Sequence, residues 1–219
     1  TDSCQGWAPK GAYAAYHKEF IYRHKPNGNW FRGYSGELVN NEQALGFCGI
    51  PLTMDEKESS VTILSGEMVR PYSDEELTSM LKGGVLMDAE ALRIFEERGL
   101  AELCGCVTDK AYFSGIQEVY NDNELNGELK GWTRNIFINF GGRRPTIYSL
   151  KKLNEDAEEL SRLQSVTGID CGTGIVRYEN NIGGRVAVLP YEAWRYPDIR
   201  RRFIRRLCDW LSDRKMPIF

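Results

Sequence analysis

Residues 83–99, with the sequence GGVLMDAEALRIFEERG, constrain the fold of this chain more than any other stretch. A short apolar run follows the two glycines and is typical of a buried β-strand. Asp88 then stands at the expected N-cap of a helix, and the next ten residues place Leu92 and Phe95 on one helical face. Gly99 occupies the position of a left-handed residue that ends a helix. The stretch therefore predicts a strand followed directly by a helix, one unit of a layered α/β sheet.

Other segments repeat this pattern of short apolar strands and capped helices. Ser73 precedes Glu76 by the spacing of a capping box, so a helix is expected to begin there. The runs VTILSG at 61–66 and RVAVL at 185–189 are short and apolar, like VLMD at 85–88, and show no polar alternation. Strands that are buried on both faces have this composition. We therefore predict an α/β fold, a mainly parallel sheet with helices on both faces, with an inserted β-rich segment.

Composition divides the rest of the chain into an N-terminal arm and a domain with an insertion. Residues 1–34 are rich in glycine, proline and aromatic residues, which predicts an irregular N-terminal arm, and residues 35–49 have helical spacing. We assign residues 35–219 to one α/β domain. Alternating runs and glycines at about 107–150 predict a β-rich insertion, in which IFINF and TIYSL flank a glycine pair in the manner of an antiparallel hairpin.

Two further helices are expected. Residues 153–165 are predicted to form a helix that buries Leu160 and Leu163. The last helix starts at about Pro197, and one apolar stripe runs along it. The stripe comprises Ile199, Phe203, Leu207, Trp210 and Leu211. The arginines at 200–206 suit either an anionic partner or a solvated helix face, and nearby aspartates favour the solvated face.

Composition also excludes several classes of function. The chain has 219 residues and a formal net charge of −3, so it lacks the basic field of a general nucleic-acid binder. No apolar run approaches the roughly 18 residues that suggest a membrane span. We therefore expect no nucleic-acid and no membrane partner. Six cysteines are too few for a disulfide framework in a chain of this length, so the compartment stays open between cytoplasm and periplasm.

The sequence contains no recognisable catalytic constellation. Cys48 lies in a GFCG sequence that matches half of a nucleophile elbow, but it follows a helical pattern instead of a strand. Cys104 and Cys106 are spaced C-x-C and have no second pair to complete a zinc site. The two histidines, His17 and His24, both lie in the N-terminal arm. We assign no catalytic residue, no cofactor and no metal ligand.

Tryptophan rings that are exposed can stack on sugars, which makes several of them candidates for carbohydrate contact. Each of them is also an ordinary packing residue, so both interpretations stay open. The candidates for carbohydrate stacking are Trp7, Trp30, Trp132 and Trp194.

Several stretches of the chain together resemble a known family. They are ELVNNEQALGFCGIPLT, GGVLMDAEALRIFEERGLAELCGC, YENNIGGRVAVLPYEAW and DWLSDRKMPIF. They are similar to the region downstream of the catalytic barrel in β-galactosidase-like glycoside hydrolases, over roughly residues 35–106 and 175–219. The resemblance implies a flavodoxin-like fold akin to class I glutamine amidotransferases, of the type also found in β-galactosidase trimerisation domains.

The same resemblance implies a non-catalytic role. The barrel that carries the acid/base and nucleophile glutamates in that family is not in these residues, and no amidotransferase Cys–His pair is visible, so no functional residue is transferred. The expectation is an accessory or assembly domain excised from a larger carbohydrate-active enzyme. Its partners would be the catalytic barrel, a second copy of itself, or carbohydrate. A stand-alone small-molecule enzyme on an amidotransferase-like scaffold and a protein-interaction domain are the alternatives.

Overall fold

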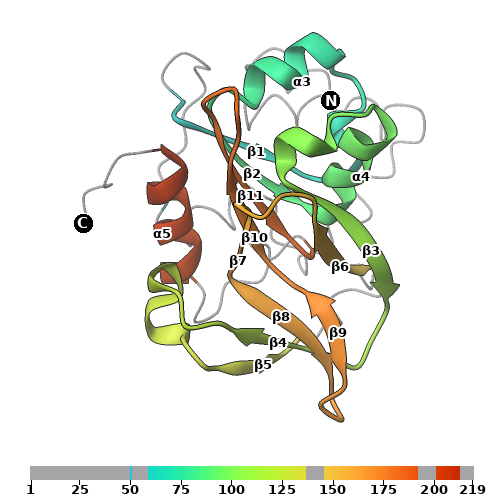
Figure 1. Cartoon of the computed structure of the whole chain (residues 1–219), viewed down its shortest axis with the longest axis vertical. Helices are drawn as coiled ribbons and strands as arrows, with labels where there is room; N and C mark the ends of the chain where they lie inside the picture. The colour runs from blue at the N-terminus through green and yellow to red at the C-terminus, as the bar shows by residue number, and fades with distance from the viewer. Residues whose placement is uncertain (1–49, 51–58, 137–145, 192–200, 213–219) are drawn as a thin grey trace, which may run out of the picture.

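Two β-sheets with a few helices packed around them make up the described part of the chain (Figure 1). The predicted arm at 1–34 and the helix predicted at 35–49 lie outside that part, as does most of the IFINF run. The computed structural model describes residue 50 and residues 59–136, 146–191 and 201–212.

The elements have the following bounds. The strands are β1 (Val61–Leu64), β2 (Gly84–Asp88), β3 (Cys106–Tyr112), β4 (Ile116–Tyr120), β5 (Thr133–Asn135), β6 (Ile147–Lys152), β7 (Glu158–Glu159), β8 (Ser161–Ser165), β9 (Asp170–Thr173), β10 (Val176–Glu179) and β11 (Arg185–Leu189). The α-helices are α3 (Asp74–Met80), α4 (Ala89–Glu97) and α5 (Arg201–Ser212). Short 3₁₀ helices are η4 (Gly66–Val69), η5 (Ala101–Cys104) and η6 (Glu124–Leu129).

The five-stranded sheet has the order β1-β2-β11-β10-β7. β1, β2 and β11 run parallel to one another, so the VTIL, VLMD and RVAVL segments are direct neighbours. β10 runs antiparallel to β11, and β7 runs antiparallel to β10. β2, which pairs with a parallel strand on each side, is buried along its whole length, which explains its uninterrupted apolar run.

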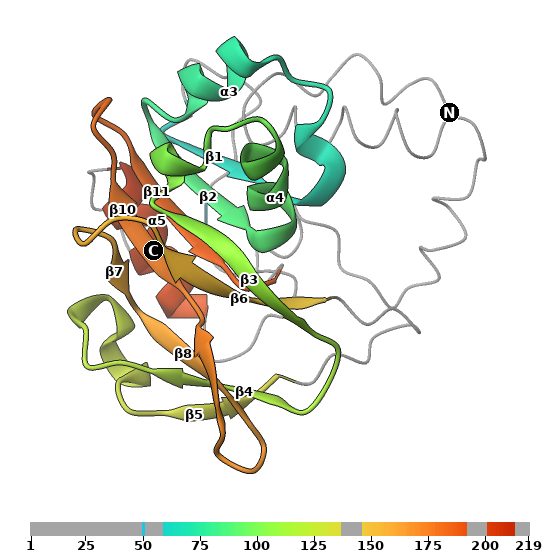
Figure 2. The ribbon, with the colours of Figure 1, turned by 45° about the vertical axis from the view of Figure 1, so that its right-hand side comes forward.

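The six-stranded sheet has the order β3-β6-β9-β8-β4-β5, and every pairing in it is antiparallel. Figure 2 shows β3 and β6 beside α4, and β4 and β5 at the opposite end of this sheet. β3 lies at one edge, where its pairing with β6 shifts register between Thr108 and Ala111. A bulge of this kind, together with the exposed charges of Asp109 and Lys110, hinders the addition of another strand.

The predicted fold class was wrong. The described residues form a β-rich fold of two mostly antiparallel sheets, and not a mainly parallel α/β sheet with helices on both faces. The reason is the path of the chain after α4. A doubly wound fold would continue with a further parallel strand. This chain instead enters the six-stranded sheet, adds the short β7 to the edge of the first sheet, and completes the first sheet with the β10–β11 hairpin after β8 and β9. The apolar composition of three strands indicated their burial and carried no information on this return path.

Residues 153–165 do not form the predicted helix either. They contain β7 and β8, and β8 pairs with β4 on one side and with β9 on the other. Leu160 and Leu163 are buried as predicted. Their spacing suits one face of a helix, but hydrogen bonding to two neighbouring strands outweighs a weak local helical preference.

The local signals around α3 and α4 are confirmed. The Ser73 side chain accepts a hydrogen bond from the Glu76 N–H, and the Glu76 carboxylate accepts one from the Ser73 N–H. Asp88 caps α4 by accepting a hydrogen bond from the Ala91 N–H at 2.7 Å. Gly99 has a φ of 71°, the left-handed conformation expected just after the helix. These signals act within one turn, which is why the sequence alone reveals them.

The apolar side chains form two cores. One core lies between the five-stranded sheet and helices α3 and α4, and it includes Leu77, Val85, Met87, Leu92 and Phe95. The other lies among both sheets and α5, and it includes Leu86, Leu163, Ala187, Phe203 and Leu207. Among the helices that the structure describes, none is long and apolar enough to cross a membrane.

α5 buries most of the part of the predicted stripe that the structure describes, whereas Ile199 and the predicted start at Pro197 lie outside the described residues. Phe203 and Leu207 have no exposed surface, and Trp210 is half-buried. The guanidinium groups of Arg177 and Arg185 lie 5.2 and 5.6 Å from the centre of the Trp210 ring. Cation–π contacts of this kind join α5 to β10 and β11. The helix therefore acts as a packing element of the second core.

Arg206 departs from the prediction that the arginines of this helix lie in solvent. Its guanidinium donates hydrogen bonds to the carbonyls of Leu125 at 2.7 Å and Asn126 at 2.8 Å. It also pairs with the Glu128 carboxylate at 2.8 Å. These contacts join α5 to η6, a segment distant in sequence, so no pattern within the helix could indicate them.

We expect Arg206→Ala to lower the free energy of unfolding by about 2 kcal/mol, because two backbone carbonyls lose a charged donor. Arg202→Ala is the matched control, since Arg202 is exposed on the same helix, and it should change stability by no more than about 0.5 kcal/mol. Urea denaturation of both variants checks the prediction. Equal effects would show that the η6 contacts contribute nothing specific.

Candidate functional site

In α/β proteins, ligands bind at the carboxyl ends of the parallel strands. Asp88 ends β2 and Ser65 follows β1, and both side chains are buried. Ser65 Oγ donates a hydrogen bond to Asp88 Oδ2 at 2.7 Å. The N–H groups of Gly66 and Ala91 donate to Asp88 Oδ1 at 3.0 and 2.7 Å. This carboxylate therefore holds two strand ends and the start of α4 together.

A second buried carboxylate, Glu118, lies on β4 of the six-stranded sheet. The Tyr120 hydroxyl donates to its Oε2 at 2.8 Å, and Ser161 Oγ donates to its Oε1 at 2.9 Å. Ser161 Oγ in turn accepts a hydrogen bond from the Ile175 N–H at 2.9 Å. The cluster links β4, β8 and the segment before β10, so its polar atoms serve the packing of the sheet.

Cys104 and Cys106, the two cysteines of the C-x-C sequence, are both buried. Burial raises the pKa of the Cys104 and Cys106 thiols well above the usual value. Protonated thiols are poor nucleophiles and poor metal ligands. Over the described ranges, no group of three or more His, Cys, Asp or Glu side chains is placed to hold a metal ion. Cys48, His17 and His24 lie outside these ranges.

Trp132 is the one candidate for sugar stacking that falls within the described residues. It lies between η6 and β5, and 53% of its surface is exposed. The other three candidates, Trp7, Trp30 and Trp194, lie outside those residues. Among the four candidates, the structure therefore places Trp132 alone, as an exposed side chain.

Three large apolar side chains are exposed on the turns β3–β4 and β8–β9 of the six-stranded sheet, which Figure 1 shows on the side away from α3. The Val166 N–H joins the two turns by donating to the Gly115 carbonyl at 2.9 Å. Phe113 is 62% exposed, Val166 60% and Ile169 67%. We call these three residues the apolar tip. Side chains exposed to this degree are available for contact with another molecule.

Hydrogen bonds within the turns hold the apolar tip in shape. The Ser165 hydroxyl accepts hydrogen bonds from the Thr167 and Ile169 N–H groups at 3.2 and 3.1 Å. Gly115 and Gly168 have φ angles of 69° and 83°, which other residues adopt only with strain. The tip is therefore built from two tight turns with defined conformations.

Sequence reasoning did not find the apolar tip. The signal that could have pointed to it is shared by FSG at 113–115 and VTG at 166–168, because both place a large apolar residue before a hydroxyl residue and a glycine. Glycine and hydroxyl residues are common in tight turns, so this order predicts a turn that follows an apolar residue. Nothing in the sequence, however, shows that the two turns lie side by side.

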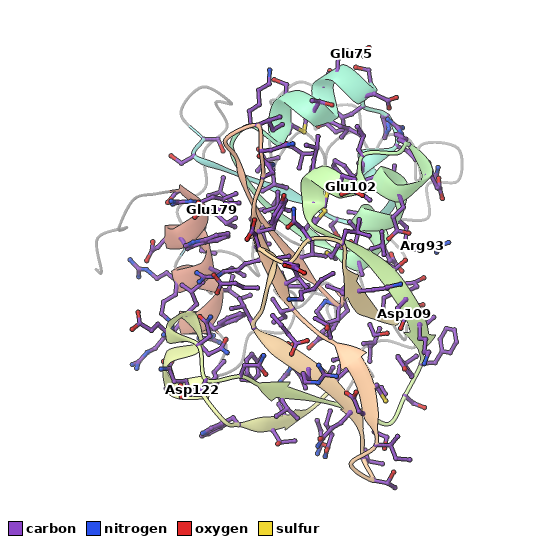
Figure 3. All side chains as sticks on the ribbon, in the orientation of Figure 1. Glu75, Arg93, Glu102, Asp109, Asp122 and Glu179 are labelled. Atoms are coloured by element: carbon purple, nitrogen blue, oxygen red, sulfur yellow. The ribbon has the colours of Figure 1, made fainter. Side chains whose placement is uncertain are left out.

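Charges of both signs lie beside the apolar tip. Arg162 pairs with Asp170 at 2.7 Å. The Arg162 hydrogen bond is the largest cause that lowers the pKa of the Asp170 carboxyl, followed by the hydrogen bond from the Gly172 N–H. Asp109 and Lys110 on β3 are both exposed, and Asp109 is seen on the outer rim of the molecule in Figure 3. The described residues near the two turns therefore carry charges of both signs.

Together, the described residues form a β-rich fold of two sheets, in which the Asp88 and Glu118 carboxylates are buried and hydrogen-bonded and Phe113, Val166 and Ile169 are exposed. No protein-family model matches the sequence, and no curated protein matches it. The comparisons with solved structures give similarities of fold alone.

Three of these solved structures illustrate the level of similarity. The mmIFT52 N-terminal domain is 14% identical over 92% of this chain and 97% of that chain, with a TM-score of 0.48. A GMP synthase subunit protein from Thermoplasma acidophilum is 10% identical over 80% and 79% of the two chains, with a TM-score of 0.42. The exo-beta-1,4-mannosidase Op5Man5 from Opitutaceae bacterium strain TAV5 is 14% identical over 78% of this chain and 29% of its own, also with a TM-score of 0.42. Sequence identities and TM-scores as low as these indicate neither a family nor a function for this chain.

Proposed function

We propose that this chain is a non-catalytic accessory or assembly domain, of the kind attached to the catalytic barrel of β-galactosidase-like carbohydrate-active enzymes. The hydrogen bonding of Asp88 carries the proposal. This carboxylate lies at the strand ends where an α/β enzyme presents catalytic groups. Both of its oxygens accept hydrogen bonds from Ser65, Gly66 and Ala91, which gives the carboxylate a structural task.

Other groups in the described residues support the same proposal. Glu118 accepts two hydroxyl hydrogen bonds inside the core, and the Cys104 and Cys106 thiols are buried and protonated at neutral pH. The exposed apolar side chains of Phe113, Val166 and Ile169 are available for contact with another protein. The proposed partners are the catalytic barrel of a parent enzyme and a second copy of the chain.

An activity assay of the purified chain tests the proposal. We expect no hydrolysis of chromogenic β-galactosides or β-mannosides and no release of ammonia from glutamine above the buffer rate. Asp88→Asn should leave these rates unchanged and lower the free energy of unfolding by about 1–2 kcal/mol, because the amide accepts fewer hydrogen bonds than the charged cap. Turnover that Asp88→Asn or Glu118→Gln removes from a protein with an intact circular dichroism spectrum would overturn the proposal.

A further inference from the structure

We propose that Asn126 is a modification site, at which spontaneous deamidation is prevented while η6 is docked on α5 and proceeds once η6 detaches. Asn126 is followed by Gly127. An asparagine before a glycine is the pair that loses its side-chain amide most readily in flexible chains, because glycine has no side chain to hinder the approach of its own backbone nitrogen to the asparagine side chain. This site is independent of the proposed assembly role.

The reaction needs water and no other reactant. The Gly127 backbone nitrogen attacks Asn126 Cγ, so a C–N bond forms and closes a cyclic imide. The Cγ–Nδ2 bond breaks, and the side-chain nitrogen leaves as ammonia with the proton that the backbone nitrogen gives up. Water then opens the imide and leaves an aspartate or an isoaspartate at this position. The net change is the replacement of an amide by a carboxylate.

The fold requires both members of this labile pair. Asn126 is fully buried, and its Nδ2 donates hydrogen bonds to the carbonyls of Asn121 and Leu160, both at 2.8 Å. Gly127 has a φ of 51°, and a Cβ atom there would lie 2.7 Å from the guanidinium carbon of Arg206. Another residue at this position would strain the backbone and displace the arginine. The pair therefore has a structural task that a less labile sequence would not perform.

The surroundings of Asn126 suit an amide and not a carboxylate. The carbonyl oxygens of Asn121 and Leu160 face its Nδ2, whereas its Oδ1 is buried and accepts no hydrogen bond from the described residues. A carboxylate has acceptors and no donor, so its oxygens would lie against the same two carbonyls. A buried charge without a donor is strongly unfavourable. Deamidation would therefore prevent η6 from returning to its position.

Arg206 holds the nucleophile of the reaction in place. η6 lies against α5 (Figure 1), and the Arg206 guanidinium donates to the Asn126 carbonyl at 2.8 Å and to the Leu125 carbonyl at 2.7 Å. The Asn126 carbonyl belongs to the same peptide group as the attacking Gly127 nitrogen. Attack requires release of this peptide group and of the Asn126 side chain, which is a local opening of η6.

Peptide mapping by mass spectrometry, during incubation of the intact chain at mildly alkaline pH, tests the proposal. Deamidation at Asn126 should be at least about tenfold slower in the folded chain than in the same chain unfolded in urea. Arg206→Ala should accelerate it at least about tenfold in the folded chain, because two charged hydrogen bonds are lost. Arg202→Ala is the matched control on the exposed side of α5 and should leave the rate unchanged. The second such pair in the sequence, Asn27–Gly28, is measured in a separate peptide.

A variant weakened elsewhere separates local opening of η6 from global unfolding. Asp88→Asn removes a charged cap from α4 and should leave the rate at Asn126 unchanged in the folded chain. Equal acceleration by Asp88→Asn and Arg206→Ala would overturn the proposal, because global unfolding would then control the reaction. Equal rates in the folded and unfolded chain would also overturn it.

The product can be tested without waiting for the reaction. Asn126→Asp should lower the unfolding midpoint, because its carboxylate meets two carbonyls. Asn135→Asp is the matched control, since Asn135 is exposed and its Oδ1 accepts a hydrogen bond from Gln117, which a carboxylate also accepts. An Asn126→Asp protein as stable as this control would contradict the proposed effect of deamidation. None of these results depends on the activity assay.

Discussion

Gly184→Ala is expected to prevent this chain from folding. Gly184 lies at the end of the β10–β11 turn, where its backbone approaches the segment after α3 so closely that a Cβ atom would overlap the Leu81 carbonyl oxygen. Movement of the Leu81 carbonyl is opposed by the hydrogen bond that it accepts from the Asn180 side chain at 2.8 Å. The same Cβ would lie 2.8 Å from the Gly83 carbonyl oxygen, which accepts a hydrogen bond from the Arg185 N–H.

Relief of this overlap would require separation of β11 from the segment after α3, and thus disruption of the centre of the five-stranded sheet. We expect a loss of more than about 4 kcal/mol, which is at the extreme for a single substitution. The measurement is the circular dichroism spectrum and unfolding transition of the purified variant. Gly83→Ala is the matched control, because its Cβ would meet only an ordinary contact of 3.6 Å, and it should fold normally. A folded Gly184→Ala protein of near wild-type stability would contradict this account.

Phe203→Ala is expected to lower the free energy of unfolding by about 3–5 kcal/mol, because it leaves a large cavity in the core between the sheets and α5. Phe203 has no exposed surface. Its ring meets the edge of the Tyr120 ring, with 5.7 Å between the ring centres and 71° between their planes. The substitution therefore removes both apolar area and a favourable aromatic contact.

Phe113→Ala makes the same chemical change on the surface, where 62% of the side chain is exposed. It should alter stability by no more than about 0.5 kcal/mol. Chemical denaturation of the two variants at low protein concentration gives the comparison. If Phe203→Ala were as stable as Phe113→Ala, α5 would not be the packing helix that the structure describes, and the anionic-partner interpretation of its arginines would regain support.

The sequence by itself determined the features that depend on neighbours within one or two turns. The N-cap of Asp88, the capping box of Ser73 and Glu76, and the left-handed Gly99 all follow from hydrogen bonds between residues a few positions apart. The burial of β2 follows from its uninterrupted apolar run. Such signals are complete within a short window, so they can be recognised without knowledge of the fold.

The candidate site lies beyond the reach of such short windows. The sequence indicated Asp88 as a cap, but only the structure shows that Ser65 and Gly66 from the end of β1 share the same carboxylate. It likewise indicated no link between Phe113 and Ile169, which the tertiary structure places on adjacent turns. The proximity of these two turns therefore could not be identified from the sequence residue by residue.

Tertiary structure alone decided the fold class. Leu160 and Leu163 have a spacing that suits a helix, and their segment became strands because β4 and β9 offered backbone hydrogen bonds on both sides. Arg206 belongs to an amphipathic helix pattern, yet it is fixed by carbonyls of a distant 3₁₀ helix. The physical reason is common to both cases: local preferences amount to less than about 1 kcal/mol per residue. Pairing and packing with segments distant in the chain outweigh them, and the sequence does not show which distant segments will meet.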